Sequence, residues 1–328
     1  MIIVTGGAGF IGSNVVAALE ARGERRIVVS DWLEAETKWR NIAKHPLLDI
    51  VLPEALPAFI EANAGAVRAV YHLGAISETT AVDGDLIVQR NFKTSVDLWE
   101  VCARHGIAYI YASSAATYGD GELGFEDSND LSVARQLRPL NLYGWSKWLF
   151  DCWVLSRIAE GGAAPPVWAG LRFFNVYGPN EYHKGAMQSL VSKIVAAHKP
   201  GAPVKLFKSY KEGFADGEQL RDFIYVDDIV NVMLWLGALD RPGGILNVGT
   251  GSARSFADLA KAAVRACGDT PVIEFVEMPE SIRPAYQYYT CANMSRLRAL
   301  GYNQEFTSLE AGVTSYVQDY LLAADKYR

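Results

Sequence analysis

The sequence predicts an α/β protein in which a doubly wound parallel sheet carries a smaller α/β lobe. Three observations predict this fold class. Over residues 1–177, short β-branched runs alternate with amphipathic segments of helix length, which is the pattern of βαβ units in a parallel sheet. A glycine cluster separates the first such run from the first amphipathic segment. Beyond Tyr177, prolines and glycines become frequent, which indicates a lobe of different construction.

Each element of the large unit follows from its local pattern. Strands are expected where short apolar runs end at glycine or at polar residues, as in the opening run 1–5. Helices are expected where apolar residues recur at helical spacing, as Ile11, Val15 and Leu19 do. The expected strands are 1–5, 26–31, 69–75, 107–116 and 166–178, and the expected helices are 10–22, 85–105 and 143–159.

The second half of the chain is expected to return once to the large unit. Residues 208–222 are polar and are expected to form a loop, whereas residues 222–239 have the pattern of a strand and a helix. Two short helices are expected at 255–267 and 308–324. The predicted division gives the large domain residues 1–177 plus about 221–247 and the smaller lobe about 178–220 plus 248–328.

Composition excludes several classes of protein. The formal net charge of −6 argues against nucleic acid as a partner. The four cysteines are scattered without a CxxC pair, so we expect reduced cysteines and no disulfide frame or metal site. The chain opens without a basic signal-peptide region, and no apolar run reaches the roughly 18 residues that a membrane span needs. These features predict a cytoplasmic, globular protein.

A phosphate-binding turn is predicted from Gly6, Gly9 and Gly12, which lie between the first strand and the first helix. Glycines let backbone N–H groups approach a pyrophosphate, and the helix N-terminus adds partial positive charge. Asp31, at the end of the second strand, is placed to bind a ribose hydroxyl. By itself this carboxylate favours NAD, but Lys38 and Arg40 follow closely and could neutralise the 2′-phosphate of NADP. Solvated cations of a polar loop remain the alternative.

Tyr143 and Lys147 are four residues apart on a predicted helix, so they share a face. A free tyrosine titrates near about pH 10, and a neighbouring ammonium is expected to lower that pKa. Ser113 and Ser114 end a predicted strand at the edge where ligands of open α/β sheets bind. The Ser114 hydroxyl is expected to hydrogen-bond an oxygen that is being oxidised, although a purely structural strand-end serine is the alternative.

Four segments, TGGAGFIGSN, YASSAATYG, YGWSK and FFNVYGP, occur in this order between residues 5 and 179. Together they resemble the extended short-chain dehydrogenase/reductase family. The resemblance implies a Rossmann-type dinucleotide-binding domain, a nicotinamide cofactor and a nucleotide-sugar substrate held by the C-terminal lobe. It also implies that Tyr143 is the acid/base, that Ser114 assists it, and that Lys147 contacts the nicotinamide ribose.

The same resemblance implies further contacts, residue by residue. On the cofactor side they are Phe10, Ile11, Trp32, Leu73, Gly74, Ala75, Ile76, Ser77, Asn91, Val176 and Lys184. On the substrate side they are Asn175, Ala186, Lys193, Phe207, Lys208, Ser209, Tyr210, Arg221 and Tyr286. Arg221 suits a diphosphate through paired hydrogen bonds, with an ion pair to a nearby acid such as Asp222 as the alternative. Tyr286 could equally be a packing residue.

The branches of this family differ in their proton carriers. Its dehydratases need an acid directly after the serine position, but Ala115 stands there, which argues against that branch. A 4-epimerase inverts a ring carbon and needs one tyrosine. An epimerase that inverts a side-chain carbon is expected to pass through an aldehyde, which must present both faces, so two acid/base groups on opposite sides would serve it.

The segment FFNVYGPNEYHKGAM resembles this last branch, in which the lysine of HKG is the second acid/base. The resemblance assigns that role to Lys184 and implies an ADP-sugar substrate, NADP with NAD left open, and a homo-oligomer, a pentamer among the options. A lysine can work so only if burial or neighbouring cations lower its pKa. The alternatives are a solvated surface lysine, a nucleotide-hexose 4-epimerase, and a nicotinamide-binding sensor without turnover.

Three positions and one loop depart from the pattern of this branch. Ala186 stands where a serine is usual, Lys193 where a histidine is usual, and Trp32 where a smaller polar residue is usual. The loop before Arg221 is also longer. These departures put the details of substrate recognition in doubt more than the chemistry.

Overall fold

The computed structural model describes residues 1–33, 37–280, 283 and 286–328. A seven-stranded sheet with the order β11-β6-β5-β4-β1-β2-β3 forms its centre. Every neighbouring pair in this sheet is parallel. Its strands are β1 (Ile2–Thr5), β2 (Ile27–Ser30), β3 (Asp49–Val51), β4 (Ala69–His72), β5 (Ala108–Ser114), β6 (Trp168–Phe173) and β11 (Gly244–Val248). The predicted fold class is confirmed. The strand order turns back between β1 and β4, and such a switch point is where ligands bind in these sheets.

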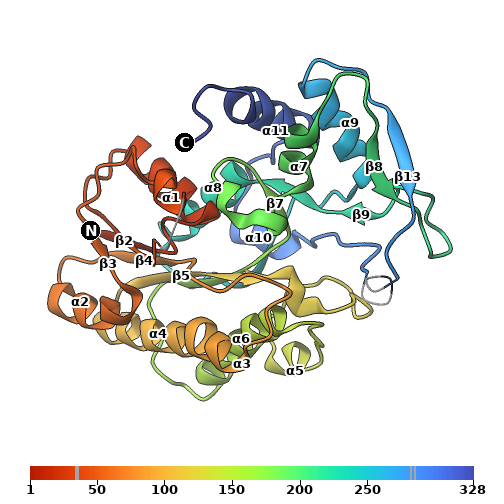
Figure 1. Ribbon diagram of the computed structural model, residues 1–328. Helices are drawn as coiled ribbons and strands as arrows, with labels where there is room; N and C mark the ends of the chain where they lie inside the picture. The colour runs from red at the N-terminus through yellow and green to blue at the C-terminus, as the bar shows by residue number, and fades with distance from the viewer. Residues whose placement is uncertain (34–36, 281–282, 284–285) are drawn as a thin grey trace.

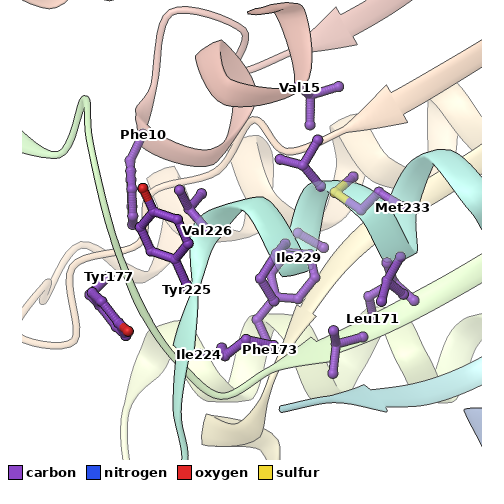
Figure 2. Packing of buried hydrophobic residues seen from close by; sticks show 14 of the residues in the cluster. Phe10, Val15, Leu171, Phe173, Tyr177, Ile224, Tyr225, Val226, Ile229 and Met233 are labelled. Carbon is purple, nitrogen blue, oxygen red and sulfur yellow. The ribbon is translucent and has the colours of Figure 1, made fainter. Parts of the chain in front are cut away.

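Helices cover both faces of the sheet (Figure 1). One face carries α1 (Phe10–Ala21) and α8 (Val226–Leu236), and the other carries α2 (Leu56–Asn63), α4 (Thr94–His105) and α6 (Leu142–Ala159). Figure 2 shows Met233 of α8 beneath Val15 of α1, with Ile229 above Phe173 of β6. This burial on both faces explains why the strands have continuous apolar sequences.

Two sequence predictions needed correction. Residues 85–105 were expected to form one helix but are divided into α3 (Gly84–Ile87), the π-helical turn η3 (Val88–Lys93) and α4. The strand in 222–239 is β10 (Phe223–Tyr225), followed by α8. It pairs with β7 (Asn175–Tyr177) in a separate two-stranded sheet, and β11 is the strand that returns to the central sheet. Local pattern indicates a strand but does not identify its partner.

The C-terminal lobe contains two further small sheets. β8 (Val204–Phe207) pairs with β13 (Ile273–Val276) in parallel, and β9 (Leu220–Arg221) pairs with β12 (Arg254–Ser255) antiparallel. The helices of this half are η5 (Tyr182–Met187), α7 (Leu190–Ala197), α9 (Phe256–Ala266), α10 (Ser295–Leu300), α11 (Leu309–Ser315) and the π-helical η7 (Tyr316–Leu321). The remaining short elements are η1 (Lys38–Asn41), η2 (Pro53–Ala55), η4 (Ala115–Tyr118) and α5 (Leu131–Ala134). Within the described part of the chain, no helix has both the length and the apolar character needed to cross a bilayer.

Candidate active site

A cavity of about 940 Å³ lies at the carboxyl ends of the central strands, between the sheet and the C-terminal lobe. It brings together most of the predicted site residues. Those that line it are Gly6, Gly9, Phe10, Ile11, Gly12, Asp31, Trp32, Lys38, Leu73, Gly74, Ala75, Ile76, Ser77, Ser114, Tyr143, Lys147, Asn175, Val176, Lys184, Lys193, Phe207 and Tyr286. Asn91, Ala186, Lys208, Ser209, Tyr210 and Arg221 lie outside this lining.

The glycine turn is as tight as a phosphate-binding turn requires. Gly6 has φ +62°, and a Cβ there would lie 2.7 Å from the backbone nitrogen of Gly74. A Cβ on Gly12 would lie 2.1 Å from the carbonyl oxygen of Gly6. The turn therefore packs backbone against backbone, and the first N–H groups of α1 face the cavity without a side-chain cap. This arrangement fits the pyrophosphate of a dinucleotide.

Asp31 and Lys38 form an ion pair at the far end of this turn, with 2.8 Å between Lys38 Nζ and Asp31 Oδ1. The second carboxylate oxygen of Asp31 accepts the Ala8 N–H at 2.9 Å. Burial raises the pKa of Asp31, and Lys38 acts in the opposite direction. Trp32 lies beside this pair with the Arg90 guanidinium 4.2 Å from its ring centre, whereas Arg40 is exposed. Lys38 thus stands where a ribose 2′-substituent is expected.

The first two turns of α6 hold Tyr143 and Lys147 in the cavity. Asn141 fixes where the helix begins, because its side chain accepts the Gly144 N–H at 2.8 Å. Burial raises the pKa of Tyr143, and a hydrogen bond with Ser114 lowers it. Burial lowers the pKa of Lys147 to about 8, opposed by Asp151. The net shift of the Tyr143 pKa is upward, because burial outweighs the hydrogen bond with Ser114.

A buried network beneath Lys147 was not foreseen. Asp151 accepts hydrogen bonds from Tyr111 (3.1 Å), Ser113 (2.9 Å) and Arg172 Nε (3.1 Å). Ser113 therefore faces this network and only Ser114 faces the cavity. The available signal was Asp151 itself, an acid one helical turn after Lys147 on the same face of α6.

Asn91 is buried behind the cavity and ties two of its walls together. Its side chain accepts the Ile76 N–H at 2.8 Å and donates to the Ile76 carbonyl at 2.9 Å. It also donates to Ser146 Oγ of α6 at 3.0 Å. Asn91 thus holds the loop after β4 against the helix of Tyr143.

Lys184 lies in η5 and enters the cavity from the side of the C-terminal lobe. Its ammonium is 5.5 Å from the centre of the Phe10 ring, next to the glycine turn. Burial lowers the pKa of Lys184, and Glu181 raises it. Burial also lowers the pKa of the neighbouring His183 to about 4, with help from Lys38 and Lys184. Lys184 is therefore a cavity residue, and the surface-lysine alternative is wrong.

Arg221 is a buried cation without a carboxylate partner among the described residues. Its guanidinium donates to the carbonyls of Leu220 (2.9 Å) and Gln287 and lies 5.6 Å from the Tyr286 ring centre. The alternative partner Asp222 is occupied by four other donors, which are Thr250 N, Thr250 Oγ1, Gly251 N and Ala292 N. A buried, unpaired guanidinium next to the cavity is suited to an anionic ligand.

The remaining predicted substrate residues form the outer edge of the site. Lys193 Nζ donates to the Ala186 carbonyl at 2.6 Å. Lys208 pairs with Glu277 at 2.7 Å, and the exposed Tyr210 donates to the same carboxylate. Lys193 lines the cavity, whereas Ala186, Lys208 and Tyr210 lie outside its lining.

Comparisons with known proteins agree with this geometry. A model of the NAD dependent epimerase/dehydratase family matches residues 2–249. An ADP-L-glycero-D-manno-heptose-6-epimerase of Fusobacterium nucleatum is 48% identical over 335 aligned residues, which cover 100% of both chains. The crystal structure of the Helicobacter pylori enzyme of that name has a TM-score of 0.77 and 27% identity, with 97% and 95% of the two chains covered. A Thermus thermophilus UDP-glucose 4-epimerase in complex with NAD has a TM-score of 0.72 and 25% identity, with 98% and 99% covered.

Proposed function

The chain belongs to the NAD dependent epimerase/dehydratase family and, within it, groups with the ADP-L-glycero-D-manno-heptose-6-epimerases; from this premise we propose how its site works. The reaction converts ADP-D-glycero-D-manno-heptose into ADP-L-glycero-D-manno-heptose by inversion at C6. The observation that carries the proposal is the presence of two proton carriers in one cavity. Tyr143 comes from α6 of the sheet domain and Lys184 comes from η5 of the lobe.

The reaction starts at the C6 hydroxyl of the substrate. Tyr143 takes the hydroxyl proton while C6 loses its hydrogen as hydride, which leaves a C6 ketone. The aldehyde expected from the sequence is wrong, because C6 of a heptose is bonded to both C5 and C7. The bound nicotinamide supplies a reversible hydride acceptor next to C6. The ketone then turns about the C5–C6 bond, so that hydride returns to its other face. Lys184 gives a proton to the carbonyl oxygen in this second orientation. Exchange with solvent then removes the proton from Tyr143 and returns one to Lys184, so that no atom is gained or lost overall.

The residues around Tyr143 prepare it for this task. Ser114 shares a hydrogen bond with Tyr143 and orients the reacting oxygen. Lys147 has a pKa lowered to about 8 by burial, yet it stays largely protonated at neutral pH. Its positive charge favours the phenolate of Tyr143 once the ligands fill the cavity and exclude water.

NADP is the proposed cofactor. Support comes from the Lys38–Asp31 ion pair, because Lys38 offsets the carboxylate charge that would otherwise repel a 2′-phosphate. Mass measurement of the nicotinamide released on denaturation tests this. A released nicotinamide with the mass of NAD would contradict the preference for NADP. It would not contradict the proposed epimerase reaction.

The lobe formed by about 178–220 and 248–328 is proposed to hold the ADP-heptose, with residues 1–177 and about 221–247 as the cofactor domain. Arg221 binds the diphosphate, since its guanidinium lacks a carboxylate partner among the residues described. The Phe207–Tyr210 segment lies beside the nucleotide. We further propose that Ala186 and Lys193 replace the usual contacts to the sugar.

The enzyme is proposed to work in the cytoplasm as a homo-oligomer, supplying heptose precursors for the lipopolysaccharide core. This rests on the family membership of the full chain. Light scattering on the purified protein measures its assembly state, and a monomeric mass would contradict the oligomer.

Parallel assays of ADP-D-glycero-D-manno-heptose and of UDP-glucose, without added cofactor, test the function. We expect epimerisation of the heptose alone. Tyr143→Phe and Lys184→Met should each lower kcat by about 10²- to 10⁴-fold, the contribution typical of general acid–base catalysis. Lys199→Met is the matched control, because Lys199 is exposed and lies outside the cavity.

Each other outcome has a defined meaning. Full activity of Lys184→Met would contradict the proposal that Tyr143 and Lys184 both transfer protons. Turnover of UDP-glucose in place of the heptose would indicate a 4-epimerase. Bound cofactor without any isomerisation would indicate a nicotinamide-binding sensor.

A further inference from the structure

The segment that precedes Lys184 is held in an unusual backbone conformation. Asn180 is fully buried and has φ +71°, the only positive φ among the described residues other than glycine. Its side chain donates to Ser13 Oγ of α1 at 3.0 Å, and its carbonyl accepts from the Asn41 side chain at 3.1 Å. A left-handed residue costs about 1–2 kcal/mol, so the surrounding contacts must hold this turn in place.

Residues 325–328, here called the tail segment, supply several of these contacts. The backbone N–H of Arg328 donates to Asn180 Oδ1 at 3.0 Å. The Arg328 guanidinium donates to Asn14 Oδ1 of α1 at 2.8 Å and forms a two-pronged ion pair with Asp227 of α8. Its Nε also donates to the Tyr320 hydroxyl at 3.1 Å. One arginine thus joins α1, α8 and the turn at Asn180.

The tail segment also holds Tyr182, two residues before Lys184. The Tyr182 hydroxyl donates to the Lys326 carbonyl at 2.7 Å. The Tyr327 ring meets the Tyr182 ring edge-on at 5.4 Å, and the Lys326 ammonium lies 4.5 Å from the Tyr182 ring centre. Figure 1 shows the C-terminus between α1 and α11. The tail segment therefore contacts the residues before Lys184 at two positions, Asn180 and Tyr182.

The same contacts reach the cofactor turn. Asn14 donates to the carbonyls of Phe10 and Pro179, both at 2.9 Å. Asn41 donates to the Ala8 carbonyl at 2.9 Å while it also holds Asn180. A continuous hydrogen-bonded path thus runs from the glycine turn through the turn at Asn180 to the tail segment.

We propose that Arg328 is a positioning residue for Lys184, fixing the Asn180–Lys184 segment against α1 so that the lysine faces the same point as Tyr143. The inference rests on the proposed function and assigns a task to residues far from the cavity lining. The other side of the segment is anchored separately, because Glu181 accepts hydrogen bonds from Ser189 of α7. Loss of Arg328 should therefore loosen one side of the segment without releasing it from the lobe.

Arg328→Ala, Arg328→Lys and Arg298→Ala form the test set. Arg298 is the matched control, because it too is half-buried, donates to two carbonyls and packs on two aromatic rings. For Arg328→Ala we expect kcat on the heptose to fall about 10- to 100-fold with KM changed less than about threefold, since a misplacement of about 1 Å can cost a factor of 100. Arg328→Lys, which can keep one contact with Asp227, should recover part of the loss. Arg298→Ala should keep kcat.

Hydrogen–deuterium exchange of residues 180–187 gives a second readout that needs no turnover. Arg328→Ala should speed exchange in this segment at least about tenfold while α4 and α6 exchange as before. Should Arg328→Ala fail to fold, Tyr182→Phe provides the second variant, because it removes the hydroxyl that donates to the Lys326 carbonyl. It should show the same pattern with smaller effects.

The outcomes separate the two proposals. Unchanged exchange and unchanged kcat in Arg328→Ala would overturn the positioning role. An equal fall of kcat in Arg298→Ala would reduce Arg328 to general support of the fold and also overturn it. A wild-type protein that does not epimerise the heptose would contradict the proposed function, while the exchange result would still decide whether Arg328 holds the segment of Lys184.

Discussion

Single residues determine whether the glycine turn has room to bind the proposed cofactor. Gly12 illustrates this, because no side chain fits between the first turn of α1 and the Gly6 carbonyl. The sequence could predict this position, since spacing alone places Gly12 at the start of a helix. The sequence could not predict that Arg221 lacks a carboxylate partner. Asp222 accepts hydrogen bonds from backbone N–H groups of Thr250 and Ala292 instead, and these groups reach it only in the folded protein.

Gly12→Ala is expected to abolish tight cofactor binding. The added Cβ would lie 2.1 Å from the Gly6 carbonyl oxygen, so the phosphate turn must open, at a cost of about 1–3 kcal/mol for overpacking. The nicotinamide content per mole of purified protein measures the effect. Gly65→Ala is the control, because a Cβ there meets nothing within 4 Å. A full complement of cofactor in Gly12→Ala would contradict this account of the turn.

His72 should make stability depend on pH. It is buried between Thr5 and Ser95, at 2.7 Å and 2.9 Å, and burial lowers its pKa to about 3, helped by Lys147. The ordinary pKa of histidine is about 6.5. Below this pH His72 is protonated in the unfolded chain but stays neutral in the folded chain. This contribution to stability is therefore complete above pH 6.5 and is lost as the pH falls toward 3.

Urea unfolding at pH 7 and pH 5 of the wild type and of His72→Gln measures this effect. Between pH 7 and pH 5 the free energy of unfolding of the wild type should fall by up to about 2 kcal/mol more than that of His72→Gln. This follows from about 1.4 kcal/mol for each pH unit below the ordinary pKa of histidine. Equal losses in both proteins would show that His72 is not the group responsible.

At the scale of elements, helix starts position the chemistry. Asn141→Ala removes the cap of α6 at Gly144 N–H and should cost about 1 kcal/mol of stability. It should also lower kcat, because the freed turn carries Tyr143. Ser308→Ala removes the equivalent cap of α11 at Ala311 N–H and should lower the thermal midpoint without lowering kcat. Equal kcat losses in the two variants would contradict a local effect.

The elements were predictable from sequence where burial imposes a pattern. The strands β1, β2, β4 and β5 have continuous apolar runs and were located within a few residues. The short edge strand β3 was missed, since two of its three residues are exposed and give no such run. The pairing of β7 with β10 was also missed, because it joins chain segments that only tertiary structure brings together.

At the scale of the whole molecule, the cavity is shared by the sheet domain and the lobe, so its ligands should bind only the folded state. Ligand stabilisation at 100 times Kd is about 2.7 kcal/mol. After removal of the bound nicotinamide, NADP is expected to raise the thermal midpoint more than NAD at equal concentration. Lys38→Ala should abolish this difference, since Lys38 offsets the Asp31 charge. A larger shift with NAD would contradict the proposed preference.

The place of β11 in the sheet has a consequence for synthesis on the ribosome. Among the residues that the structure describes, β11 pairs only with β6, yet the whole stretch from β7 to α8 is translated between these two strands. During that interval the nascent chain exposes one edge of β6, and unpaired strand edges are templates for aggregation. We therefore expect that chains stalled before residue 244 depend on chaperones, whereas release soon after residue 248 lets the sheet close.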